Sequence, residues 1–357
     1  MKEHMRLWLL AFYAVILLSF QPLDMPLSNF FSDHGIAAYG FYLLLVLSAG
    51  FFILLQCVQI LIKALVAISR LFGISQFTTS FLVLGVAAVL PEFSISLNSA
   101  IEGNPAFGLG ILLGSNVTDL TLILGVIAIL SSGVSVAGVL AHRNFNYYLL
   151  LLALPLLLML DGEYSRIDGA LLLAGFVLNA MMMSSGKKSA AEVLNHIEHH
   201  KLQSGFQFLL IALSLIVLFS SANVVAGKAV LIASVLNVPS FFLGVLLAAA
   251  TCLPELTFSL EAIREKRKEL GLGDILGNVI TDATLTLGVL ALLFPFKIPE
   301  MILAVFTAVS MLIVGALAIH FLRTGRQLDR KEGLMLLLIY FVFLIAQIVL
   351  EGKAAIN

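Results

Sequence analysis

The sequence predicts an all-α integral membrane protein, with ten core transmembrane helices in two inverted five-helix repeats and one extra N-terminal helix. Three observations lead to this fold class. The composition is too apolar for a soluble protein, eleven apolar segments are separated by polar or Gly/Pro-containing breaks, and two stretches of the chain repeat one another.

The composition excludes several classes of protein. Of the 357 residues, 61% are hydrophobic and 11% are charged, whereas a soluble domain has about 25% charged residues. With a mean hydropathy of +1.08, most of the surface must face lipid. The net charge of −1 gives no reason to expect a nucleic-acid partner. Cys57 and Cys252 lie in apolar segments, so neither a disulfide framework nor a thiolate metal site is expected.

The apolar segments are predicted to be membrane spans, because a helix needs about 20 residues to cross the hydrocarbon core. They are 7–22, 36–70, 77–102, 107–131, 144–160, 167–184, 205–235, 239–263, 270–294, 299–322 and 333–350. The first follows Lys2 and Arg6 but lacks a clear small-x-small cleavage site. We therefore interpret it as a retained helix rather than a signal peptide.

The spans divide the chain into four parts and predict its orientation. Residues 1–35 form the extra helix and an external loop, 36–184 the first half, 185–204 a hydrophilic linker, and 205–357 the second half. If the N-terminus is cytoplasmic, fifteen of the 20 Lys and Arg residues fall on the cytoplasmic side and three outside. Because cytoplasmic loops collect positive charge, we expect a multi-pass protein of the cell membrane with a cytoplasmic linker.

The internal repeat is the third observation. Residues 84–126 align without a gap with residues 247–289, and 20 of the 43 pairs are identical. An odd number of predicted spans separates the two copies, so they enter the membrane from opposite sides. Inverted repeats of this kind are typical of secondary transporters, which present one site alternately to two faces of a membrane.

Carboxylates lie in the middle of apolar spans in both copies. Glu92 and Asp119 occupy the first copy, Glu255 and Asp282 the second, and 27 residues separate the members of each pair. Each Glu follows a Leu-Pro pair, and proline removes a backbone N–H and frees carbonyl oxygens. Intramembrane acids are costly and usually functional. Oxygen ligands in this number favour Ca²⁺ over transition metals; the alternative is a kinked helix pair with protonated acids and no ion.

At these residues the sequence resembles the calcium/cation antiporter superfamily, which includes the sodium/calcium exchangers. The family's G-T-S-L-P-E and G-S-N-I-F-N/D segments correspond here to residues 87–92 (A-A-V-L-P-E) with 114–119 (G-S-N-V-T-D), and to 250–255 (A-T-C-L-P-E) with 277–282 (G-N-V-I-T-D). The resemblance implies an antiporter, which is not an enzyme and has no cofactor. Its expected partners are the lipid bilayer and inorganic cations, with no nucleic acid, and a monomer is expected.

The resemblance also implies roles for individual residues. Glu92 and Glu255 would be the principal Ca²⁺ ligands, flanked by Asp119 and Asp282. The residues implied for monovalent-ion sites are Ser115, Asn278, the carbonyl or hydroxyl of Thr251, and the carbonyl of Ala88 opposite Thr251. These site residues include fewer hydroxyl groups than the family pattern, while four carboxylates exceed the charge of one divalent ion. The resemblance favours sodium as the coupling ion. Because of these two departures from the family pattern, exchange against protons, as in another branch of the superfamily, is the alternative.

Two interpretations from other functional classes, a protease and a channel, are the remaining alternatives. Residues 271–274 read G-L-G-D, the signature of intramembrane aspartyl proteases, but none of the seven tyrosines precedes the second Asp that such enzymes need. Asp274 would otherwise line a cytoplasmic vestibule or cap the start of its span. A passive cation channel is the other alternative, although channels usually form their pore from a ring of subunits.

Overall fold

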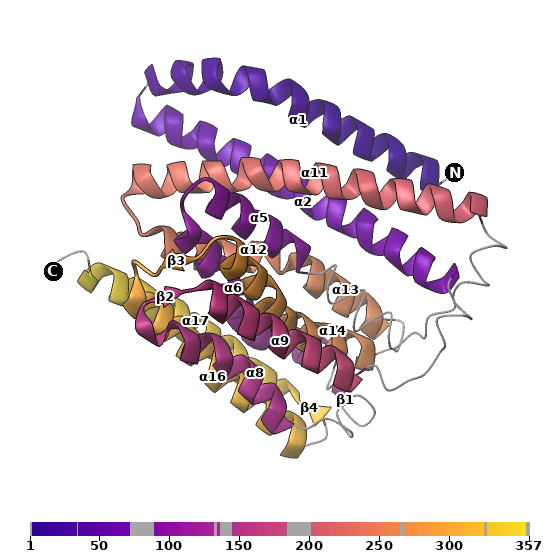
Figure 1. The fold of residues 1–357 in the computed structure, drawn as a ribbon, viewed down its shortest axis with the longest axis vertical. Helices are drawn as coiled ribbons and strands as arrows, with labels where there is room; N and C mark the ends of the chain where they lie inside the picture. Colours follow the sequence, from indigo (N-terminus) through magenta and orange to yellow (C-terminus); the bar gives the residue numbers. More distant parts are fainter. Residues whose placement is uncertain are drawn as a thin grey trace.

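The computed structural model describes residues 2–33, 35–71, 89–131, 134–135, 145–183, 201–264, 268–324 and 327–354, and these are almost entirely helical. The helices fall into two groups, which differ in their apolar packing. We call α1, α2 and α11 the three-helix layer, and the remaining helices the core (Figure 1).

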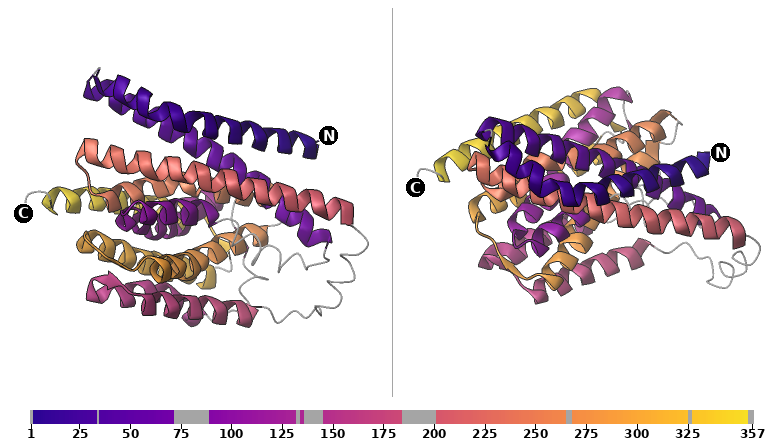
Figure 2. Two further views of the ribbon diagram at one scale, coloured as in Figure 1. Left: turned by 45° about the horizontal axis from the view of Figure 1, so that its top comes forward. Right: turned by 90° about the horizontal axis from the view of Figure 1, so that it is seen from above.

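The three-helix layer contains the longest helices of the protein. It comprises α1 (Lys2–Asp33), α2 (Ile36–Leu71) and α11 (Lys201–Leu236). The α1 and α2 helices form an antiparallel hairpin, and α1 lies on the side of α2 and α11 that faces away from the core (Figure 2). The layer has its own apolar cluster, which also includes four core side chains: Ile95, Phe107, Ile111 and Leu243.

The centre of the core is built from the two repeat copies. The first copy contains α5 (Leu90–Ile101), α6 (Pro105–Thr118), the π-helical segment η2 (Asp119–Ile123) and α7 (Leu124–Leu130). The second contains α12 (Ser240–Thr251), α13 (Leu253–Arg264), α14 (Lys268–Thr281), the π-helical η4 (Asp282–Thr286) and α15 (Leu287–Leu293). Elements with the same position in the two copies therefore have matching lengths and matching breaks.

The remaining core helices flank these copies. They are α8 (Phe145–Leu158) with the 3-10 turn η3 (Met159–Asp161), α9 (Arg166–Met183), α16 (Met301–Thr324) and α17 (Arg330–Ala354). The last helix of each half packs against the other half, because α9 contacts α15 and α17 contacts α7. Both contacts involve glycines: a β-carbon on Gly125 would lie 2.8 Å from the carbonyl oxygen of Gly333, and one on Gly288 would lie 3.1 Å from that of Gly169.

Two short antiparallel strand pairs also join the halves. β1 (Val134–Ser135) pairs with β4 (Gln327–Leu328), with Val134 opposite Leu328. β2 (Glu163–Tyr164) pairs with β3 (Phe296–Lys297), with Glu163 opposite Lys297. The two pairs lie at opposite ends of the helices (Figure 1).

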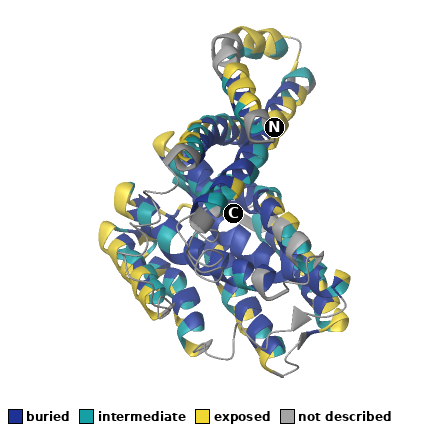
Figure 3. Cartoon of the chain, turned by 90° about the vertical axis from the view of Figure 1, so that its right-hand side faces the viewer, coloured by how far each residue is buried: buried dark blue, intermediate teal, exposed yellow. Residues whose placement is uncertain are grey.

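The outer faces of the helices are strongly apolar. Exposed large hydrophobic side chains occur on α17, for example, at Leu334, Leu338, Phe341, Val342 and Ile345. Exposed residues lie around the rim of the structure and buried ones in its interior (Figure 3). A soluble protein would not expose so much apolar surface, so these faces fit a lipid environment. The chain is an all-α, multi-pass membrane protein.

Seven helices of the described part are long and apolar enough to cross a membrane, by length and composition. They span Ala38–Leu65, Pro105–Leu130, Gly205–Leu236, Ser240–Thr257, Gly271–Leu293, Met301–Arg323 and Arg330–Glu351. This number is smaller than the eleven predicted. The first part of the predicted span 77–102 lies outside the described residues, and the apolar parts of α1 and α8 are shorter helices. The predicted span 167–184, which is α9, is also not among the seven. The predicted linker 185–204 also lies outside them, except for the start of α11.

The predicted boundaries differ from the structure in two places. The first helix does not end near residue 22, because α1 continues through Pro22 and Pro26 to Asp33. The span predicted over 239–263 is divided at Cys252 into α12 and α13. Pro254 is the reason for the second difference, since proline has no N–H to continue the hydrogen-bond ladder.

Candidate functional site

The four predicted carboxylates lie at the breaks in the central helices. Glu92 is in the first turn of α5 and Glu255 in the first turn of α13. Asp119 and Asp282 are the first residues of the π-helical segments η2 and η4. All four side chains are buried. Single π-helical turns within α-helices are frequent at functional sites, and here each coincides with one of the acids.

Two hydrogen bonds connect the copies at this point. The Ser115 hydroxyl, in the first copy, donates to Asp282 Oδ2 of the second at 2.8 Å. The Asn278 side-chain amide, in the second copy, donates to Asp119 Oδ2 of the first at 2.6 Å. Ser115 and Asn278 occupy equivalent positions of the repeat, as do the two aspartates. The same contact is therefore made twice, in opposite directions.

Two more side chains of the second copy contact the first copy beside these hydrogen bonds. The Thr251 hydroxyl, at the end of α12, is near the Glu92 carboxylate, and it also donates to the carbonyl of Ala248 at 2.9 Å. The Cys252 thiol, at the break before α13, lies 3.7 Å from the Ser115 carbonyl oxygen. The site thus lies at the contact between the copies and not within either one.

The two glutamates differ from the aspartates in their partners. Within the described part of the chain, both carboxylate oxygens of Glu92 and both of Glu255 are buried without a hydrogen-bond partner, and so is Oδ1 of each aspartate. Glu92 is also within electrostatic range of Asp119, Glu255 and Asp282. Buried acceptors without partners are costly, and a bound cation would satisfy them.

The local sequence explains why the acids are held at this depth. Pro91 and Pro254 occupy the first turn of α5 and α13, where a missing N–H costs nothing. Each of these helices then packs closely on the next: a β-carbon on Gly108 would lie 2.9 Å from Ser96 Cα, and one on Gly271 would lie 3.1 Å from Ser259 Cα. The serine hydroxyls donate to the carbonyls of the same glycines at 3.1 and 3.3 Å.

A cation at this site would draw on other oxygen ligands besides the carboxylates. In the part of the chain that the structure describes, no three His, Cys, Asp or Glu side chains are grouped closely enough to hold a metal ion. A cation here would also need hydroxyl, amide and backbone oxygens, of which Ser115, Asn278 and Thr251 are the buried candidates. Hard cations such as Ca²⁺ accept this mixture of oxygen ligands. Ala88, the remaining predicted ligand, lies outside the described residues.

Two further polar side chains lie near this region and have no counterpart in the other copy. Asn116 is buried, and neither its amide nitrogen nor its oxygen has a hydrogen-bond partner among the described residues. Asp274 is also buried, and its charge acts on Asp119 and Glu255. Their equivalents are Val279 and Ile111, so the repeat symmetry that marked the other candidate residues could not mark these two.

The structure corrects one interpretation of Asp274. It does not cap the start of its span, because α14 begins at Lys268 and Asp274 lies well inside the helix. A capping side chain would precede the first turn and bond to a free backbone N–H.

Comparison with known proteins agrees with this architecture. The family model "Sodium/calcium exchanger protein" matches residues 41–184 and 206–349. The sodium/calcium exchanger MaX1 of Methanosarcina acetivorans is 24% identical over 343 residues, which cover 84% of this chain and 97% of the relative. "Putative antiporter CaxA" of Alkalimonas amylolytica is 29% identical over 283 residues, covering 77% of this chain and 88% of that protein.

The solved structures of the sodium-calcium exchanger NCX_Mj share the fold. One of them has a TM-score of 0.59 and 24% identity, over 85% of this chain and 97% of that one. The relatives named as exchangers and antiporters are transporters and not enzymes, so the intramembrane-protease alternative is wrong. Since the family model matches most of both halves, the chain belongs to the sodium/calcium exchanger protein family.

Proposed function

We propose that this protein exchanges Ca²⁺ for a monovalent cation, with Na⁺ favoured, by alternating access to the site between the two repeat copies. The observation that carries the proposal is the reciprocal pair of hydrogen bonds, from Ser115 to Asp282 and from Asn278 to Asp119. It gives a buried, acidic, nearly symmetric site at the contact of two copies. A symmetric site can face either side of the membrane with little change in its own geometry.

The proposed architecture has ten core helices in two inverted five-helix halves, with α1 as an extra helix. Several features support the inversion. The family model matches each half separately. β1 and β3 follow equivalent helices of the two copies, yet they belong to strand pairs at opposite ends of the molecule (Figure 1). The last helix of each half, α9 or α17, packs against the opposite half. A twofold axis in the membrane plane would produce this reciprocal packing.

In the proposed site, Glu92 and Glu255 are the principal Ca²⁺ ligands, because their four oxygens are buried without hydrogen-bond partners in the described part of the chain. Asp119 and Asp282 contribute their free oxygens, while their other oxygens are held by Asn278 and Ser115. The hydroxyls of Ser115 and Thr251 and the Asn278 amide oxygen complete the candidate ligands. Each glutamate lies at a helix N-terminus, where the helix dipole stabilises negative charge.

Access would change through movement of α2 and α11 against the core. These two helices pack tightly on each other and share an apolar cluster separate from that of most of the core. A group of helices that pack mainly on one another can slide as one body, because its internal contacts change little. In the proposed orientation the N-terminus and the linker 185–204 are cytoplasmic, and the cell membrane is the expected location.

Exchange against protons is the second candidate. Two observations favour it: Asp274 adds a fifth buried carboxylate within electrostatic range of Asp119 and Glu255, and Cys252 replaces a hydroxyl residue of the family's motif. Extra carboxylates can carry protons, while few hydroxyl groups leave fewer ligands for Na⁺.

Calcium uptake into proteoliposomes tests both candidates. The purified protein is reconstituted, and ⁴⁵Ca²⁺ uptake is measured under an outward Na⁺ gradient, an outward H⁺ gradient, and neither. Uptake driven by Na⁺ alone supports the first candidate, and uptake driven by H⁺ alone supports the second. Uptake without any counter-ion gradient would instead indicate a passive channel.

Neutralising either glutamate tests the site. Glu92→Gln and Glu255→Gln keep the side-chain shape but remove the charge, so we expect each to abolish calcium exchange without loss of folding. Folding is checked by a single symmetric peak in size-exclusion chromatography. Normal calcium transport by either variant would show that the site assignment is wrong.

A further inference from the structure

A lysine lies within the membrane-spanning part of α11. Lys228 belongs to the predicted span 205–235, and only 9% of its side chain is exposed. A charged side chain at such a position is costly unless it is paired. It is not part of the repeat copies and has no role in the proposed ion site.

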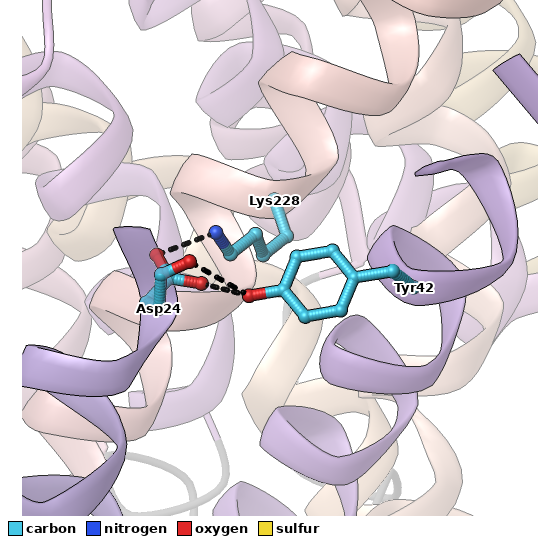
Figure 4. Close-up of polar contacts among 3 residues, drawn as sticks. All are labelled: Asp24, Tyr42 and Lys228. Carbon is cyan, nitrogen blue, oxygen red and sulfur yellow. Dashed lines mark hydrogen bonds and ion pairs between the residues drawn. The ribbon is translucent and has the colours of Figure 1, made fainter. Parts of the chain in front are cut away.

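Lys228 pairs with the extra helix. Its Nζ donates to Asp24 Oδ2 of α1 at 2.7 Å, and 31% of the Asp24 side chain is exposed. The hydroxyl of Tyr42, on α2, donates to Asp24 Oδ1 and lies 3.3 Å from the Asp24 carbonyl oxygen. The ammonium also lies 5.6 Å from the centre of the Tyr42 ring, within range of a cation–π interaction. We call these three residues the three-helix clamp, since each comes from a different helix of the layer (Figure 4).

The packing of α1 agrees with the clamp. Leu10, Tyr13 and Leu17 are buried and belong to the apolar cluster of α2 and α11. On the opposite face of α1, Trp8 and Phe12 are largely exposed. Within the described residues, the substantial contacts of α1 are with α2 and α11. The helix is therefore attached to the layer and not to the core.

A core carboxylate lies close to the same lysine. Glu102 follows α5, and its Oε1 would be 3.2 Å from a β-carbon on Gly227, the residue before Lys228. Its charge and that of Lys228 interact. Lys228 thus lies between a carboxylate of α1 and one of the core, and among the described residues it forms its ion pair with Asp24 of α1.

We propose that the clamp of Asp24, Tyr42 and Lys228 makes α1 a permanent part of the moving layer, so that α1, α2 and α11 shift against the core as one body during exchange. The shift against the core rests on the proposed alternating access, whereas the attachment of α1 to α2 and α11 does not. Without the clamp, Lys228 is released from α1 and can pair with Glu102 of the core. The clamp therefore also determines whether Lys228 of α11 pairs with α1 or with the core.

Distances between spin labels test the proposal on the full-length protein. Exposed positions are available on α1 at Phe12, on α11 at Ile216 and on α16 of the core at Ile313. Three variants each carry cysteines at two of these positions, and both cysteines are spin-labelled. The native Cys57 and Cys252 are buried and stay unlabelled. Double electron–electron resonance then gives the α1–α11, α1–α16 and α11–α16 distances, with saturating Ca²⁺ and without ions.

The variant Asp24→Asn with Lys228→Met removes both charges, so that no unpaired charge is left buried. The matched control is Thr307→Val with Gln347→Leu, which removes a buried interhelical hydrogen bond between α16 and α17 in the core. The reversed pair, Asp24→Lys with Lys228→Asp, restores the ion pair. If the uncharged double variant does not fold, Lys228→Met alone takes its place, because the Asp24 side chain that it leaves unpaired is 31% exposed.

In the wild type and the control, we expect one α1–α11 distance in both ion conditions, while the α1–α16 and α11–α16 distances both shift between the two conditions. In the uncharged variant, we expect loss of the single α1–α11 distance, while the reversed pair keeps it. An uncharged variant with the wild-type α1–α11 distance would overturn the clamp. So would an α1–α16 distance that stays constant while α11–α16 shifts. An unchanged α11–α16 distance would instead count against alternating access, and the clamp would still be decided by the variant comparison.

Discussion

Removing either donor of the reciprocal hydrogen bonds should weaken calcium binding. The variants are Ser115→Ala, which leaves Asp282 Oδ2 without its donor, and Asn278→Ala, which does the same for Asp119. Both donors are buried, so water cannot readily replace them. Each aspartate would lose the contact that fixes its side chain at the boundary of the copies. The two variants should have similar effects because the two contacts are equivalent.

The structure gives the expected magnitude. The donor–acceptor distances of 2.8 and 2.6 Å are in the range of strong, charge-assisted bonds. A hydrogen bond to a charged group contributes about 1.5–3 kcal/mol. If that free energy is lost from the bound state, the dissociation constant for Ca²⁺ rises by about 10- to 150-fold. Removing both donors should have a larger effect than removing either one.

Isothermal titration calorimetry of the purified protein at low Na⁺ measures the affinity directly. Thr281→Val is the control, since the hydroxyl of Thr281 bonds to the carbonyl of Gly277 in its own helix at 2.7 Å. The double exchange Ser115→Asn with Asn278→Ser swaps the donors between the copies and should retain more affinity than either alanine variant. If the donors instead compete with the cation for the carboxylates, the alanine variants will bind Ca²⁺ more tightly, and that result would refute the reasoning.

Two further predictions concern stability. A β-carbon on Gly110 would lie 2.1 Å from the Phe241 carbonyl oxygen, so Gly110→Ala should force α6 and α12 apart and destabilise the protein by about 1–3 kcal/mol. A lowered melting temperature in detergent checks this, and Gly40→Ala, where nothing lies within 4 Å, should have no such effect. Burial raises the pKa of the Glu300 carboxyl. Hydrogen bonds with its own backbone and with that of Phe241 lower this pKa, but by less than burial raises it. The associated stability is present in acid and is lost as the pH rises through the raised pKa, so Glu300→Gln should raise the melting temperature at pH 8 and leave it unchanged near pH 4. A variant that is less stable than the wild type at pH 8 would contradict this.

Much of the candidate site could be predicted because its residues are marked in both copies. Glu92, Asp119, Glu255 and Asp282 are conspicuous as acids in apolar segments, and the offset of 163 residues relates them in pairs. Ser115 and Asn278 followed from the family motif, and the structure brings both to the opposite copy. Asn116 and Asp274 have apolar equivalents, so no repeat pattern distinguishes them from incidental polar residues.

The helix boundaries could be predicted less well. Hydropathy responds to the apolar length of a segment and not to its backbone geometry. It therefore ended the first helix near residue 22, although α1 reaches Asp33, and it treated residues 239–263 as one span. The π-helical turns at Asp119 and Asp282 left no pattern in the sequence, because a single wider turn shifts the helical periodicity by only one residue.

The sequence by itself determined that this protein lies in a membrane, that it is built from two related copies, and that acids lie at equivalent depths in both. These properties depend on composition and on spacing along the chain, which can be measured without coordinates. Only the tertiary structure decided which side chains meet. Asp282 contacts a residue 167 positions away, Asp119 one 159 positions away, and Asp24 one 204 positions away. Such pairs are fixed by how whole helices pack, and packing depends on the shapes of all the surfaces that meet, so no local pattern in the sequence contains it.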